Sequence, residues 1–137
     1  MKNEVIALSE YHNIISTLIE KHRFNSLLKI EVTSFMIKYY KDSNLLKKSA
    51  KNHFKDFFSS LLTVLYTKSQ DLNVINECIY ILEKEGFIKV KTDNVVRIKN
   101  LFYVSDDFFS NTEVDETIRI INEMSIDSFV EDLITYA

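Results

Sequence analysis

The chain has few of the residues that interrupt helices or shape tight backbone sites: among 137 residues it has one glycine and no proline. Without these residues the backbone can stay helical over long stretches and must turn at Asn, Asp and Ser. A single glycine also excludes phosphate-binding loops and dinucleotide fingerprints, because both need several glycines for close backbone approach. We therefore expect a mainly helical protein that has no nucleotide cofactor.

Cysteine and long apolar runs are also scarce. The single cysteine, Cys78, excludes an intramolecular disulfide and is typical of the reducing cytoplasm. It falls on the apolar side of a predicted helix, so we expect a buried, unreactive thiol. No apolar run approaches the roughly 20 residues that span a bilayer, and His12, His22 and His53 have no metal-ligand spacing. We expect a cytoplasmic, non-enzymatic protein with no metal, no cofactor and no membrane contact.

The net charge of −3 conceals an uneven distribution of charge along the chain. Residues 1–104 contain 16 Lys and Arg against 11 Asp and Glu, a balance of +5. Residues 105–137 contain nine acids against Arg119 alone, a balance of −8. An acidic segment of this kind can dock on the basic body of the same chain, face a basic partner or stay solvated, and charge does not rank these alternatives.

Apolar residues at helical spacing predict helices at about 10–22, 25–40, 43–67, 72–85, 113–124 and 126–136. Ser9, Asn25 and Ser43 are the expected N-caps of the first three. The helix over 72–85 has its buried face at Leu72, Ile75, Cys78, Ile79 and Leu82. Gly86 follows it directly and is expected to end it in a left-handed conformation.

A basic β-hairpin is predicted directly after Gly86, with strands at 87–91 and 95–99. A three-residue loop at 92–94 keeps the apolar residues on one face by pairing Val90 with Val96 and Ile88 with Ile98. Asn94 is expected to take the left-handed position of this loop. The run 101–104 either extends the second strand or docks on the core.

Two groups of basic side chains are candidates for contact with a nucleic-acid backbone. The first lines one face of the predicted helix over 43–67 and consists of Lys47, Lys48, Lys51 and Lys55. The second lies on the hairpin and consists of Lys89, Lys91, Arg97 and Lys99. For both groups the alternative is an ordinary solvated surface.

The order of helical body, helix 72–85, Gly86 and basic hairpin resembles a winged-helix domain over residues 25–104. Residues 1–24 then form an N-terminal helix, and residues 105–137 form an acidic helical extension. A helix that reads DNA should present Arg, Lys, Asn or Gln to base edges. The outward positions of helix 72–85 include Glu77 and Glu83, whose carboxylates repel phosphate. This departure favours winged-helix proteins that recognise other proteins.

The whole plan is similar to the small accessory subunits of SMC-like ATPase complexes, of the tandem winged-helix type. It is also similar to the middle components of bacterial three-component ATPase defence systems. The resemblance implies a non-catalytic adaptor that binds a coiled-coil ATPase in genome maintenance or anti-phage and anti-plasmid defence, with weak nonspecific DNA contact. The expected partner interface consists of Asn73, Asn76, Glu77, Tyr80, Glu83, Phe129 and Leu133.

Two other hypotheses stay open at the level of sequence. A homodimeric winged-helix transcription regulator would dimerise through its terminal helices and grip DNA with its hairpins. An inhibitor that mimics DNA would use the acidic segment at 105–137.

Overall fold

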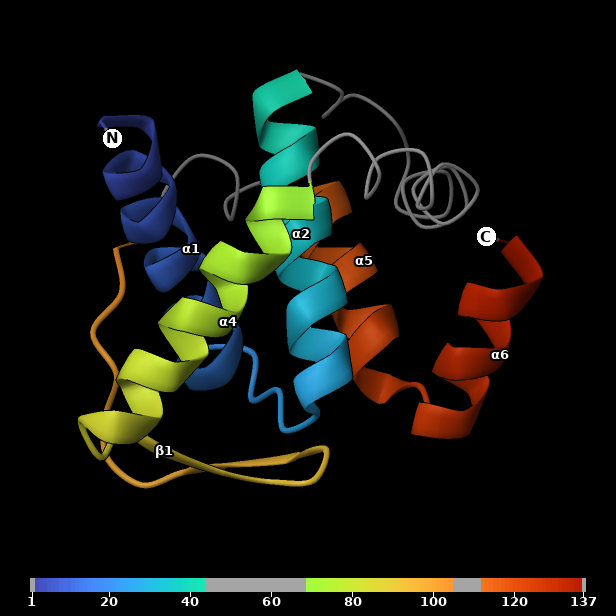
Figure 1. The fold of residues 1–137 in the computed structure, drawn as a ribbon. Coiled ribbons are helices and arrows are strands. Elements are labelled where there is room, and N and C mark those ends of the chain that lie inside the picture. The colour runs from blue at the N-terminus through green and yellow to red at the C-terminus, as the bar shows by residue number, and fades with distance from the viewer. Residues whose placement is uncertain (1, 44–68, 105–111, 137) are drawn as a thin grey trace.

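The structure, a computed structural model, describes residues 2–43, 69–104 and 112–136 (Figure 1). Within these ranges the helices are α1 (Lys2–Glu20), α2 (Leu27–Ser43), α4 (Ser69–Lys84), α5 (Thr112–Glu123) and α6 (Ile126–Tyr136). Strands β1 (Ile88–Lys91) and β2 (Asn94–Arg97) form one antiparallel hairpin. The predicted mainly helical fold with a small hairpin is confirmed. No helix in these ranges is both long and apolar enough to cross a membrane.

Two of the predicted N-caps differ from the structure. α1 begins at Lys2, so Ser9 lies inside the helix instead of capping it, because no glycine or proline breaks the helical pattern upstream. α2 is capped by Ser26 and not by Asn25: the Ser26 carbonyl accepts the Ile30 N–H at 2.9 Å, and Ser26 Oγ accepts the Lys29 N–H at 3.3 Å. The predicted helix over 43–67 lies almost entirely outside the described residues.

Helices α1, α2 and α4 pack against one another and form the body of the protein. Side chains that are fully buried in this body include Tyr11, Ile15, Leu18, Phe35, Ile37 and Ile75. α5 packs on α2 (Figure 1), and its Val114, Ile118 and Ile121 join the same core. Phe129 of α6 also belongs to this core. The core therefore contains side chains from each of the three segments named above, residues 1–24, 25–104 and 105–137.

The end of α4 has the geometry expected at Gly86. Gly86 has φ +82°, its N–H donates to the Glu83 carbonyl at 3.0 Å, and the Phe87 N–H donates to the Leu82 carbonyl at 3.0 Å. These two bonds define a Schellman motif, which needs the residue after the helix in the left-handed region. The chain therefore turns from α4 into β1 at the predicted position.

Replacing Gly86 by alanine is expected to lower the free energy of unfolding by about 1 kcal/mol, because an L-residue is strained at positive φ. A Cβ added there would meet no atom within 4 Å, so the loss comes from backbone conformation and not from a clash. Gly86→Asn serves as the control, since asparagine tolerates this region better. Urea denaturation measures the difference, and equal stability of the three proteins would contradict the left-handed turn.

The hairpin register differs from the predicted one. Lys91 pairs with Asn94 and Val90 with Val95, so the loop has two residues, Thr92 and Asp93, instead of three. The residue at positive φ is Thr92, at +54°, and not Asn94. In this register Val96 pairs with Lys89 and not with Val90, and its side chain is exposed.

Asp93 explains the register, because it binds the N-terminus of α2. Its carboxylate accepts the Ser26 hydroxyl at 2.6 Å and the Leu28 N–H at 2.8 Å, and its backbone carbonyl accepts the Leu27 N–H at 2.7 Å. The first backbone N–H groups of a helix have no partner within the helix, so Asp93 acts as a cap from a distant segment. The hairpin consequently runs beneath the helices, with its turn under α2 (Figure 1).

A buried lysine joins the same junction to α5. Lys29 is only 6% exposed, and its ammonium donates to the carbonyls of Asn122, at 3.2 Å, and Met124. These carbonyls lie at the C-terminal end of α5, where a positive charge is favourable. Burial lowers the pKa of Lys29, and the nearby Asp93 carboxylate opposes that shift. The hairpin tip, α2 and α5 are therefore held at one point.

Candidate functional site

The outward face of α4 is the main candidate surface. The five α4 residues predicted to contact a partner are all exposed: Asn73, Asn76, Glu77, Tyr80 and Glu83. On the opposite side of the helix, Ile75, Cys78, Ile79 and Leu82 are buried as predicted, while Leu72 is half-buried. Tyr80 is 60% exposed, which is high for an aromatic residue on a helix of the body. An exposed tyrosine among polar residues is typical of protein-recognition surfaces.

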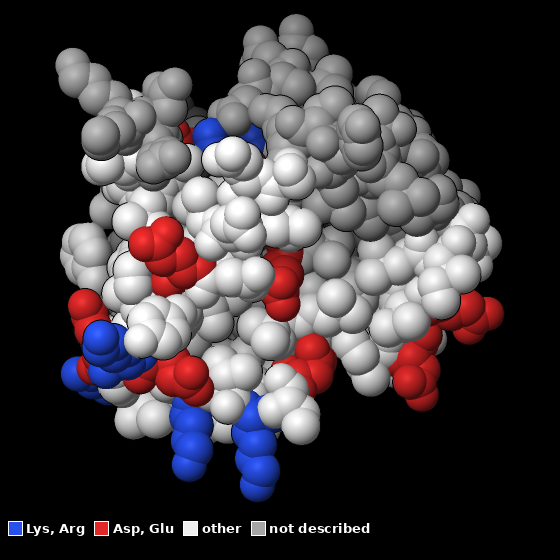
Figure 2. All heavy atoms as spheres, viewed as in Figure 1, with Lys and Arg blue, Asp and Glu red and all other residues white. Residues whose placement is uncertain are grey.

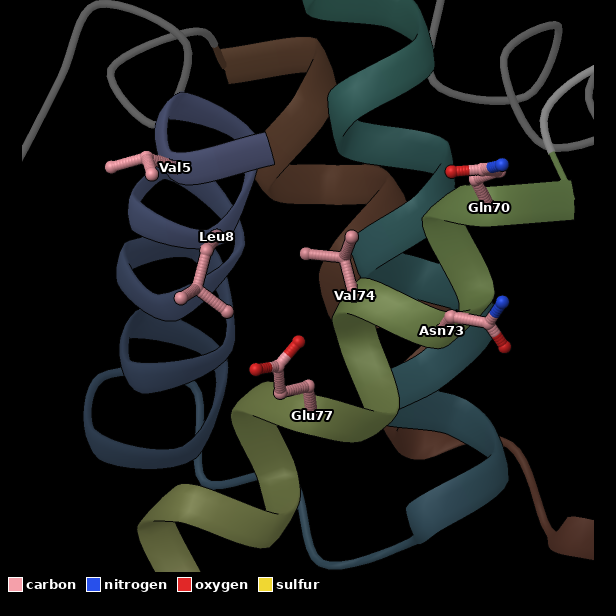
Figure 3. Close-up of a pocket in the computed structure, with 6 residues that line it drawn as sticks. All are labelled: Val5, Leu8, Gln70, Asn73, Val74 and Glu77. Carbon is pink, nitrogen blue, oxygen red and sulfur yellow. The ribbon is translucent and has the colours of Figure 1, made fainter. Parts of the chain in front are cut away.

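A hollow of about 330 Å³ lies beside this face, between α1 and α4. Figure 3 shows Leu8 of α1 and Val74 of α4 in the gap between the helices, with Glu77 extending toward α1. Gln70 and Asn73, which also line the hollow, point to the other side of α4. Leu8 and Val74 therefore give the hollow an apolar lining and Glu77 gives it a carboxylate, an arrangement that suits a side chain of a partner.

The two helices that form the hollow are fixed to each other by polar contacts. The hydroxyl of the fully buried Tyr11 donates to Asp71 Oδ2 at 2.5 Å, and Cys78 Sγ donates to the Leu8 carbonyl at 3.4 Å. Burial, with a smaller effect of Glu77, raises the pKa of Cys78 to about 12. The thiol thus stays protonated at neutral pH and acts as a core residue, as the sequence predicted.

The charge on α4 is mainly negative. Figure 2 shows acidic side chains distributed over the face where Figure 1 places α4. Glu83 accepts the Val90 N–H at 2.7 Å and so ties α4 to β1, whereas Glu77 is exposed at the rim of the hollow. The Lys84 ammonium lies 5.8 Å from the centre of the Tyr80 ring. A basic or mixed partner surface would be attracted here, and a phosphate backbone repelled.

The four predicted basic contacts on the hairpin do not form one free cluster. Arg97 binds Glu20 of α1 at 3.1 Å and Asn100 at 2.6 Å, and the Lys99 ammonium lies 4.5 Å from the centre of the Phe87 ring. Lys89 and Lys91 are exposed on the solvent side of β1. Figure 2 shows basic side chains projecting at the edge where the hairpin lies. The second basic group, Lys47, Lys48, Lys51 and Lys55, lies outside the described residues.

The two α6 residues of the predicted partner interface, Phe129 and Leu133, are less exposed than predicted. Phe129 is fully buried and Leu133 half-buried, so Phe129 does not reach the surface. The apolar side chains that α6 exposes are Ile126, Val130 and Ile134. Their four-residue spacing is visible in the sequence, but spacing alone does not tell which of two adjacent apolar stripes faces the core.

Other exposed apolar side chains were not predicted. Val5 and Ile6 are exposed on α1, and Phe102 is 81% exposed in the segment after the hairpin. This segment docks on α1, because the Asn13 side chain donates to the Val104 carbonyl at 2.9 Å and accepts its N–H at 2.6 Å. The run 101–104 therefore docks on the body and does not extend β2.

Within the described ranges no three His, Cys, Asp or Glu side chains come together as metal ligands. No protein-family model matches the chain, and neither the curated proteins nor the solved structures contain a significant match. The fold and site define a mainly helical protein with a small hairpin and an exposed acidic helix face beside a hollow.

Proposed function

We propose that the protein is a non-enzymatic adaptor that binds a larger protein through the outward face of α4 and the hollow beside α1. One observation carries the proposal: α4 presents the exposed Tyr80 and Glu77 next to a hollow that Leu8 and Val74 line. In the winged-helix resemblance, this helix corresponds to the one that would read DNA. Tyrosine supplies a large contact area at low entropic cost, and interface centres are rich in it. The hollow receives an apolar side chain of the partner.

DNA contact is secondary in this proposal. Carboxylates on α4 disfavour the approach of a phosphate backbone, and the hairpin turn is bonded to the N-terminus of α2 instead of projecting from the body. Lys89 and Lys91 remain as exposed positive charges. They support weak, salt-dependent and sequence-independent contact of the kind that phosphate binding gives.

The partner class follows from the chemistry of the site together with the resemblance. A helix that carries one or more apolar side chains for the hollow and basic residues for Glu77 fits this surface best. The coiled-coil subunit of an SMC-like ATPase complex offers such helices, which makes it the first partner to test. Genome maintenance or defence against phages and plasmids would be the processes served.

Combined replacement of Glu77 by lysine and Tyr80 by alanine is expected to weaken partner binding by about tenfold or more, because it reverses a rim charge and removes the aromatic anchor. Both side chains are exposed, so folding is preserved. The tagged full-length chain is purified from its native cells, the retained subunit is identified, and its affinity is measured by titration.

The matched control is a charge reversal on the hairpin, Lys89→Glu with Lys91→Glu. This variant is expected to bind the partner normally and to lose retention of duplex DNA at low salt. Loss of the partner in the hairpin variant, with retention in the α4 variant, would overturn the proposal. A discrete DNA footprint abolished by changes at Asn73, Asn76 and Tyr80 would favour the transcription-regulator hypothesis instead.

A further inference from the structure

α6 carries an apolar stripe that no described part of the chain covers. Ile126, Val130 and Ile134 follow one another at four-residue spacing and are 39%, 36% and 76% exposed. The core contact of this helix is made by its neighbouring stripe, through the fully buried Phe129 and the half-buried Leu133. α6 therefore has a broad apolar surface of which one half packs inward and the other half faces solvent.

The stripe lies apart from the α4 surface. Figure 1 shows α6 at the edge of the molecule away from α1, beyond α2 and α5. At its start, Ile126 also lines a hollow of about 430 Å³ between the end of α5 and the turn of the hairpin. The stripe and this hollow are continuous at Ile126, so one ligand could occupy both.

Carboxylates border one side of the stripe. Asp127 and Glu131 each follow a stripe residue directly and lie four residues apart, so they share one flank of the helix. Neither forms an ion pair with the described part of the chain. By contrast, Arg119 of α5 already binds Glu116 and, at 2.8 Å, Glu123. A like-charge pair at this spacing slightly destabilises the helix that carries it, and a cationic ligand would relieve that repulsion.

We propose that α6 is a second docking surface, and that its ligand is a basic amphipathic helix of another protein. The apolar face of that helix would cover Ile126, Val130 and Ile134, and lysine or arginine along one edge would pair with Asp127 and Glu131. This charge pattern argues against a second copy of α6 as the ligand, because two copies would place acidic flanks together. The inference does not depend on what the α4 surface binds.

The test uses the full chain and a synthetic Leu/Lys amphipathic helix peptide with a fluorescent label. Fluorescence anisotropy should show salt-sensitive binding that weakens by about tenfold in Val130→Ser with Ile134→Ser and likewise in Asp127→Asn with Glu131→Gln. The matched control, Glu85→Gln, removes one exposed carboxylate just after α4 and should leave the affinity unchanged. Glu77→Lys with Tyr80→Ala, which disables the α4 surface, should still bind the peptide in a manner that depends on α6. A peptide with glutamate in place of lysine should not bind.

Three outcomes would overturn the inference. Equal affinity of the wild-type chain and both α6 variants would show that the peptide binds elsewhere. A loss confined to Glu77→Lys with Tyr80→Ala would place the basic helix on α4, which supports the proposed function and removes the second surface. Sedimentation that reveals a dimer dissociated by Ile134→Ser would assign the stripe to self-association.

Discussion

Replacing Phe129 by alanine is expected to lower the free energy of unfolding by about 3 kcal/mol. Phe129 is fully buried in the common core, and truncation of a buried phenylalanine removes apolar burial and leaves a cavity. Ile134→Ala is the matched control on the same helix, because Ile134 is 76% exposed. Its effect should stay within about 0.5 kcal/mol. Chemical denaturation followed by circular dichroism measures both values.

This pair of variants decides on which side α6 meets the body. The sequence suggested Phe129 as part of a partner interface, and in that case its truncation would weaken binding and leave the chain stable. Equal, small effects of Phe129→Ala and Ile134→Ala would contradict the packing of α6 described above. The stripe at Ile126, Val130 and Ile134 would then not be the solvent-exposed side of α6.

Replacing Asp93 by alanine is expected to lower the free energy of unfolding by about 2 kcal/mol. The Asp93 carboxylate accepts the Leu28 N–H and the Ser26 hydroxyl, so its removal takes away this second cap of α2 and leaves the buried Ser26 hydroxyl without this acceptor. Loss of a cap typically costs about 1 kcal/mol, and the unsatisfied buried hydroxyl adds a similar amount. Denaturation by urea gives the magnitude.

The location of the effect distinguishes capping from a general loss of stability. In Asp93→Ala the amide of Leu28 should exchange with solvent faster, and this increase in exchange rate should be larger than the increase for amides in α4. Asp93→Asn is the control, since an amide oxygen can still accept one of the two bonds and the loss should be smaller. Unchanged protection of Leu28 in Asp93→Ala would contradict the contact between the hairpin and α2.

Elements set by local chemistry could be predicted from the sequence. The buried face of α4 follows from the spacing of Ile75, Cys78, Ile79 and Leu82, and its end follows from the conformational freedom of Gly86. The bounds of α5 and α6 were predicted to within one residue, because each helix has a strong helical period and a polar turn separates them.

Features set by contacts between distant segments could not be predicted. The hairpin register depends on Asp93, whose partners Ser26 and Leu28 lie more than 60 residues earlier in the chain. The sequence argument placed the apolar residues of both strands on one face and so favoured a longer loop. It took no account of the bonds that Asp93 makes to α2. Similarly, Arg97 looked like a phosphate contact, but its position opposite Ile88 brings it to Glu20 of α1. Sequence spacing carries no information on such tertiary partners.

The central claim is that the outward face of α4 recognises protein and not nucleic acid. A photoreactive amino acid placed at Asn76, an exposed position of α4, tests it most directly, with Lys91 of the hairpin as the comparison site. After irradiation in native cells, we predict that position 76 gives a discrete adduct with one larger protein that nuclease does not change. A nuclease-sensitive adduct at position 76, without a protein adduct there, would contradict the account.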